Sequence, residues 1–147
     1  MSIEKSIITC ILLFFVESCG NPIKNQSKEV AAETLLKDFY TDYITLFVQS
    51  PSAENQRKLE MLKKQFCTKD FYKKIPKIIE QTCGDVFLKA QDSDIKYLKT
   101  LKIVKDTVKD EYIVSYSADA SMHETVVVKI HVTLLKDGDT FKINGIR

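Results

Sequence analysis

The chain has 147 residues, of which 44% are hydrophobic and 29% are charged, and its formal net charge is +2. This length suits one domain with its own core, and the composition is unlike that of disordered proteins. Lysine supplies almost all of the positive charge, since the arginines are Arg57 and Arg147. Because Lys is mixed with Asp and Glu throughout, the pattern indicates a solvated surface and argues against nucleic-acid binding.

The N-terminus carries a charge-free apolar run, SIITCILLFFV, directly behind Lys5. The run is about half as long as a permanent membrane-spanning helix has to be. A short apolar run at this place is typical of the hydrophobic region of a secretory signal peptide. We therefore predict that residues 1–18 are a signal peptide that is removed from the mature protein.

The end of this run, VESC over residues 16–19, resembles the lipobox of bacterial lipoproteins, although Glu17 departs from the small or apolar residue usual there. The resemblance implies cleavage before Cys19 and acylation of its thiol. Two or more acyl chains anchor a protein stably, since each buried CH₂ contributes about 0.8 kcal/mol. The alternative is an ordinary secretory signal with Cys19 as a framework cysteine. We expect a membrane anchor on Cys19 in the bacterial envelope, in the outer membrane and facing the periplasm.

The first half of the mature chain reads as a tether followed by helices. Residues 19–28 are polar and lack apolar periodicity, which predicts a flexible tether before a single domain over residues 29–147. Apolar side chains at helical spacing predict a first helix from Glu29 to about Val48.

Two further helices are predicted from their start signals. Ser50 can cap the second helix with Pro51 at its first position, and Thr68 can cap the third. Proline lacks the N–H that a helix interior needs, so we expect the third helix to break at Pro76.

The second half alternates as strands do. One strand begins at residues 101–104, a second starts near Tyr112, and a long third runs over residues 125–135 with residues 126, 128, 130, 132 and 134 on one face. Asp137-Gly138 predicts a hairpin turn before a last strand, because glycine accepts the positive φ that such turns need. Helices first and a meander of about four antiparallel strands afterwards predict the α+β class.

Two short motifs resemble those of a bacterial lipoprotein family known as domain of unknown function 3828. They are the Ala-Gln-Asp segment that ends at Asp92 and the closing DGDTFKI over residues 137–143, where Phe141 stands in place of the usual Trp. The resemblance covers roughly the mature chain. It implies a curved sheet wrapped on helices, like the nuclear-transport-factor or cystatin-like cone, and no established activity.

Cys67 and Cys83 are the cysteines that remain once Cys10 is removed and Cys19 is acylated. An even pair in an oxidising compartment predicts a disulfide, whose loop of about 15 residues would contribute about 3 kcal/mol. The alternatives are two buried free thiols or a reactive cysteine, and no nearby histidine supports the reactive cysteine.

The histidines are His123 and His131, and along one strand they would lie more than about 20 Å apart. They therefore cannot form a local zinc site, although a histidine acid remains open. Asp92-Ser93-Asp94 lacks the rest of a calcium loop, so we expect a turn or a helix cap there. Asp85 and Asp92 could face the mouth of the cone, but no spacing argument brings them together as a carboxylate pair for acid–base chemistry.

Phosphate-binding, hydrolase and metalloprotease motifs are absent from the sequence, so we expect no cofactor and no catalytic residue. Most aromatic side chains should fill the interface between the first helix and the sheet. If the cone is open, a few could line a ligand cleft, and the candidates are Tyr40, Tyr43, Tyr112, Tyr116 and Asp92.

Two functions remain open. The sequence favours a non-enzymatic envelope lipoprotein that binds a protein, a peptidoglycan fragment or a small ligand, including an immunity or inhibitor protein. The alternative is a small enzyme that uses the interior of the cone.

Overall fold

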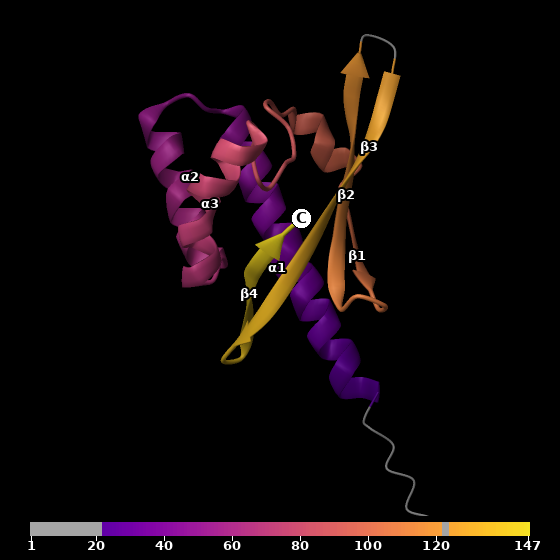
Figure 1. Cartoon of the computed structure of the whole chain (residues 1–147). Coiled ribbons are helices and arrows are strands. Elements are labelled where there is room, and N and C mark those ends of the chain that lie inside the picture. The colour runs from indigo at the N-terminus through magenta and orange to yellow at the C-terminus, as the bar shows by residue number, and fades with distance from the viewer. Residues whose placement is uncertain (1–21, 122–123) are drawn as a thin grey trace, which may run out of the picture.

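A computed structural model describes residues 22–121 and 124–147, which form three α-helices followed by an antiparallel sheet of four strands (Figure 1). The helices are α1 (Pro22–Val48), α2 (Ala53–Phe66) and α3 (Lys69–Thr82), and a 3₁₀ helix, η1 (Ile95–Lys99), follows them. The strands are β1 (Lys102–Asp106), β2 (Glu111–Ser121), β3 (Glu124–Asp137) and β4 (Thr140–Ile146), paired in chain order. The α+β class and the four-stranded meander are confirmed, and the sheet stays open.

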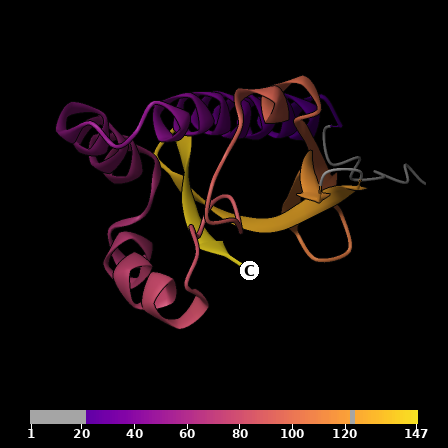
Figure 2. The same ribbon diagram turned by 90° about the horizontal axis from the view of Figure 1, so that it is seen from above.

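Helix α1 lies across the inner face of the sheet, and α2 and α3 project beyond it (Figure 2). Its buried side chains recur at helical spacing from Ala32 to Ile44. They meet the inner residues of the strands, such as Val114, Ile130 and Ile143, none of which is exposed. The predicted inner face of the long strand is therefore confirmed for the centre of β3, where Ile130 and Val132 are fully buried.

Helices α2 and α3 are attached to the sheet through the two residues between them. Cys67 forms an isolated parallel bridge with Ile143 of β4, and the Thr68 N–H donates to the carbonyl of Ile143 at 2.9 Å. The Thr68 hydroxyl also donates to Oδ1 of Asn144 at 3.0 Å. This junction therefore covers part of the outer edge of β4 and fixes where both helices begin and end.

Two helix starts differ from the prediction. Helix α1 begins at Pro22, so residues 22–28 are helical where an irregular tether was expected; proline suits the first turn, where its missing N–H has no helical partner. The N-cap of α2 is Ser52, whose Oγ accepts from the Asn55 N–H at 3.1 Å, and Ser50 lies in the preceding turn.

The predicted break at Pro76 is wrong, because α3 is continuous from Lys69 to Thr82. The Thr68 cap is confirmed, since its hydroxyl accepts from the Phe71 N–H at 3.2 Å. Pro76 leaves the carbonyl of Tyr72 without its helical donor. The buried side chains of Phe71 and Ile75 lie on one face of the helix and hold it against the core, which offsets the lost hydrogen bond.

The β3–β4 hairpin has the predicted turn. Asp137 pairs with Thr140, and Gly138 and Asp139 form the two-residue loop between them. Gly138 has a φ of 62°, a conformation that glycine adopts at little cost.

Candidate functional site

The four candidate tyrosines lie in the core. Tyr40, Tyr43 and Tyr116 are at most 1% exposed, and Tyr112 is 6% exposed. The rings of Tyr40, Tyr43 and Tyr116 pack against other aromatic rings, with Tyr43 4.9 Å from Phe87 and Tyr116 stacked 4.7 Å from Tyr97 between ring centroids. The ring of Tyr112 lies under Nζ of Lys105, 4.7 Å from its centroid. The four tyrosines fill the space between α1 and the sheet, as expected for most of the aromatics, and the ligand cleft suggested for them is not formed there.

Asp85 supports the loop at residues 84–90. Its Oδ1 accepts from the N–H groups of Phe87 and Leu88, each at 2.9 Å, and its Oδ2 accepts from the hydroxyl of Tyr43 at 2.6 Å. Burial raises the pKa of this carboxyl, and the three hydrogen bonds oppose that effect. The sequence left open a position for Asp85 at the mouth of the cone, whereas in the structure its carboxylate joins the loop to α1.

Asp92 is exposed, and no contact between its carboxylate and that of Asp85 is found in the described part of the chain. Asp94 is the N-cap of η1, where its Oδ1 accepts from the Lys96 N–H at 2.8 Å. The expected cap in this segment is confirmed.

The predicted disulfide is wrong, because Cys67 and Cys83 are both free thiols. They stand at the two ends of α3, and that helix separates them by about 20 Å. A disulfide needs Cα atoms less than about 7 Å apart. Cys67 is buried, and burial raises the pKa of its thiol to about 12, whereas Cys83 is exposed.

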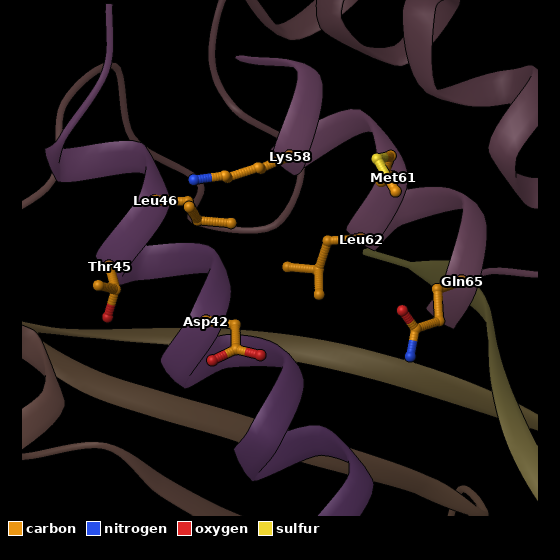
Figure 3. Close-up of a pocket in the computed structure, with 7 residues that line it drawn as sticks. All are labelled: Asp42, Thr45, Leu46, Lys58, Met61, Leu62 and Gln65. Atoms are coloured by element: carbon orange, nitrogen blue, oxygen red, sulfur yellow. The ribbon is translucent and has the colours of Figure 1, made fainter. Parts of the chain in front are cut away.

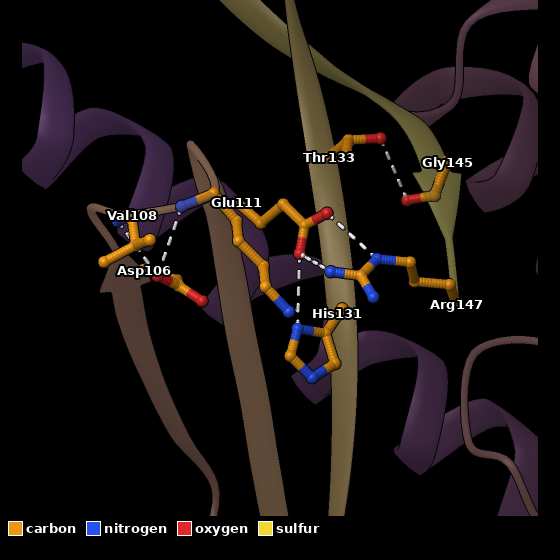
Figure 4. Close-up of polar contacts among 8 residues, drawn as sticks. Asp106, Val108, Glu111, His131, Thr133, Gly145 and Arg147 are labelled. Carbon is orange, nitrogen blue, oxygen red and sulfur yellow. Dashed lines mark hydrogen bonds and ion pairs between the residues drawn. The ribbon is translucent and has the colours of Figure 1, made fainter.

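His131 belongs to a charged cluster on the outer face of the sheet (Figure 4). Glu111 is 8% exposed, and its carboxylate accepts two hydrogen bonds from the guanidinium of Arg147, at 2.9 and 2.6 Å. Nδ1 of His131 lies 3.2 Å from the same carboxylate. Arg147 holds the pKa of Glu111 below its usual value, with His131 contributing less. The cluster joins the start of β2 to β3 and to the residue that follows β4. His123 lies outside the described residues.

A groove that the sequence does not predict lies between α1 and α2 (Figure 3), and we call it the α1–α2 groove. It encloses about 340 Å³ and is lined by Asp42, Thr45, Leu46, Lys58, Met61, Leu62 and Gln65. Leu62 points from α2 toward α1, with Leu46 and Asp42 across from it (Figure 3). The groove has an apolar centre, an acid on the α1 side and a base on the α2 side.

Met61 gives this groove an exposed apolar rim. Its side chain is 59% exposed, whereas its neighbour Leu62 is 9% exposed. Lys58 is held at the rim by an ion pair of 2.8 Å with Glu54. The residues that line the groove have the pattern of an ordinary amphipathic helix, so the sequence does not predict the groove. The one signal in the sequence is the apolar Met61 next to the buried stripe of α2.

A second groove lies on the other side of α2, against α3. It encloses about 420 Å³, with Ile75, Pro76 and Ile79 as its apolar lining and Glu60, Lys63, Tyr72, Lys73 and Glu80 around them. Glu60 is held by Lys63 at 2.8 Å and by the hydroxyl of Tyr72 at 2.9 Å. Helix α2 thus presents a groove on each flank, with both charged and apolar groups.

Within residues 22–121 and 124–147, no helix is both long and apolar enough to span a membrane. Nor do three or more His, Cys, Asp or Glu side chains gather there in a way that could hold a metal ion. Cys19, the predicted lipidation site, lies outside the described residues.

The fold is similar to a crystal structure of a protein of unknown function from Bacteroides thetaiotaomicron VPI-5482. The two chains are 26% identical with a TM-score of 0.74, and the match covers 85% of this chain and 95% of the other. No protein-family model matches the chain, and no curated protein does. The similarity supports an α+β fold that recurs in another protein.

Proposed function

We propose that this chain is a lipid-anchored envelope protein that binds an acidic segment of another protein in the α1–α2 groove. The observation that carries the proposal is the groove itself, where the exposed Met61 stands beside Leu46 and Leu62. Apolar side chains gathered in a groove with a few polar groups are typical of recognition sites. The VESC motif before residue 20 supports the anchor.

The charge of the helices favours an acidic partner. Residues 53–82, which hold α2 and α3, contain eight Lys and Arg residues and four Asp and Glu residues. The rest of the described chain is close to neutral by comparison. A partner that places an apolar side chain between Leu46 and Leu62 and a carboxylate near Lys58 would match the groove in both respects.

Helix α1 sets the distance between the anchor and the groove. The helix starts at Pro22, three residues after Cys19, and reaches the groove at Asp42. Twenty residues of helix span about 30 Å along the axis. The anchored protein would therefore hold the groove away from the point where the helix starts, within reach of proteins in the surrounding space.

An enzyme working inside the cone needs an open interior. Here Phe39, Tyr40 and Tyr116 occupy the space between α1 and the sheet. The surface grooves on α2 therefore support binding better than the interior supports catalysis.

Two variants test the anchor and the groove separately. Cys19→Ala should release the protein from membranes, and intact-mass spectrometry of the native protein should show acyl chains on Cys19.

Met61→Glu should fail to complement a deletion strain although the variant remains folded and anchored. The matched control is Val108→Glu, because Val108 is 91% exposed and lies in a turn far along the chain from the groove. Full complementation by Met61→Glu would refute the groove as the binding site.

A further inference from the structure

Four lysines meet at a cavity where α2 and α3 join the β3–β4 hairpin. The cavity encloses about 410 Å³, and its lining consists of Lys64, Cys67, Thr68, Lys69, Leu135, Lys136, Asp137 and Lys142. We call it the lysine cavity. It takes two lysines from the helices and two from the hairpin, which lie about seventy residues apart in the sequence.

The walls of the lysine cavity are held together by backbone and side-chain bonds. Thr68 donates its N–H to the carbonyl of Ile143 and its hydroxyl to Asn144. Lys142 is half-buried, and its Nζ donates to the backbone carbonyl of Gln65. These bonds join the α2–α3 junction to β4, so the walls of the cavity and Lys142 are positioned before any ligand arrives.

The positive charge in the cavity is not neutralised by nearby carboxylates. Lys58, Lys63 and Lys96 each have an ion-pair partner within 3.2 Å. By contrast, none of the four cavity lysines has an ion pair with a described residue. Asp137 is the single carboxylate in the lining, which leaves an excess of three positive charges around one cavity.

The cavity also offers an apolar wall. Leu135 is 52% exposed, and Cys67 is 4% exposed and lies at the floor where the backbone bridges to β4. The positive charge of Lys142, together with that of Lys63, acts on the thiol of Cys67 and lowers its pKa against the effect of burial. A ligand that matches both the charge and the apolar wall is an organic anion with more than one negative group.

We propose that the lysine cavity is a binding site for a small, multiply charged organic anion, held by Lys64, Lys69, Lys136 and Lys142. The site is separate from the α1–α2 groove, so either proposal can fail without the other. Lysine ammonium groups act as point charges on carboxylates and phosphates, and several together bind more tightly than one.

The test is a titration of the full chain with citrate and with inorganic pyrophosphate at constant ionic strength, followed by calorimetry and by NMR of the backbone amides. We expect saturable binding and shifts confined to residues 64–69 and 135–142. The double variant Lys69→Gln/Lys136→Gln should weaken binding by about tenfold or more. It spares Lys142, whose bond to Gln65 supports the fold. The matched control, Lys77→Gln/Lys109→Gln, removes two exposed lysines elsewhere and should change affinity by less than about twofold.

Three outcomes would overturn the proposal. One is the absence of saturable binding up to millimolar citrate and pyrophosphate. Another is an equal loss of affinity in both double variants, because general screening by surface charge would explain it. The third is binding to vesicles of phosphatidylglycerol and phosphatidylcholine that depends on Lys69 and Lys136 without any binding of the soluble anions, which would make the cavity a lipid-headgroup contact.

Discussion

The hydroxyl of Tyr43 donates a hydrogen bond of 2.6 Å to Oδ2 of Asp85, and this bond joins α1 to the loop at residues 84–90. Tyr43 is 1% exposed and Asp85 is half-buried. The other carboxylate oxygen holds the backbone of Phe87 and Leu88, whose side chains are fully buried. One carboxylate thus positions two core side chains against the first helix.

Tyr43→Phe should destabilise the protein by about 1.5–3 kcal/mol, because it leaves an oxygen of Asp85 without its donor. Tyr40→Phe provides the matched comparison in the same helix. Tyr40 is fully buried, and its hydroxyl has no hydrogen-bond partner among the described residues. Its removal should be neutral or stabilise the fold by about 1 kcal/mol. Urea denaturation of both variants measures the difference, and equal losses would contradict the assignment.

The pH dependence of stability should carry two opposite contributions. Burial raises the pKa of Asp85 above the ordinary 3.8, so the folded state binds its proton more tightly. Its contribution therefore improves as the pH falls from the raised value toward 3.8. Arg147 lowers the pKa of Glu111 below 4.5, so its contribution is complete above 4.5 and is lost as the pH falls through the folded value.

Denaturation at several pH values checks these signs in Asp85→Asn and Glu111→Gln. As the pH falls toward 3.8, the parent should gain free energy of unfolding that Asp85→Asn does not gain, so the difference between them should grow. As the pH falls below 4.5, the parent should lose free energy of unfolding that Glu111→Gln does not lose, so the difference between them should shrink. The same slope in both variants would rule out this account of the two carboxyls.

The two cysteines at the ends of α3 should react differently. Cys83 is exposed and should be alkylated quickly in the native protein, whereas Cys67 is 4% exposed with a pKa of about 12 and should react only after unfolding. Peptide mass mapping after brief treatment with iodoacetamide distinguishes the two sites. Recovery of a Cys67–Cys83 linked peptide would contradict the structure.

Pro76→Ala should stabilise the fold by about 1 kcal/mol or more, because alanine restores the N–H that the carbonyl of Tyr72 lacks. Lys74→Ala, an exposed position in the same helix, serves as the control and should change stability by less than about 0.5 kcal/mol. Thermal denaturation of the parent and the two variants measures these changes in stability. A lower melting temperature for Pro76→Ala would show that the proline ring has a packing role.

The sequence predicts the class, the strand order, the cap at Thr68 and a turn or helix cap within residues 92–94, because these depend on local periodicity and local hydrogen bonds. The disulfide prediction failed because cysteine count and compartment give no distance, and α3 keeps the two thiols apart. The break at Pro76 failed because burial of Phe71 and Ile75 outweighs the loss of one bond.

The sequence could not predict the α1–α2 groove or the lysine cavity, because each is formed by segments that are distant in the chain. Leu46 and Met61 become neighbours only through the crossing of α1 and α2, and Lys69 and Lys136 only through the pairing of Cys67 with Ile143. Such contacts between distant segments have no local signature. The candidate tyrosines, in contrast, were recognised as aromatic and amphipathic, and the structure uses them to fill the core.

Site-specific photo-cross-linking in intact cells determines whether the α1–α2 groove binds a partner protein. A photoreactive residue at position 61 should give one discrete adduct of higher mass, and the same residue at position 108 should give none. Lys58→Glu reverses the charge of the rim while disturbing only a surface ion pair, so it should abolish the adduct and leave the fold intact. Equal adducts from both positions, or an adduct from position 61 that survives Lys58→Glu, would show that the groove is not the binding site.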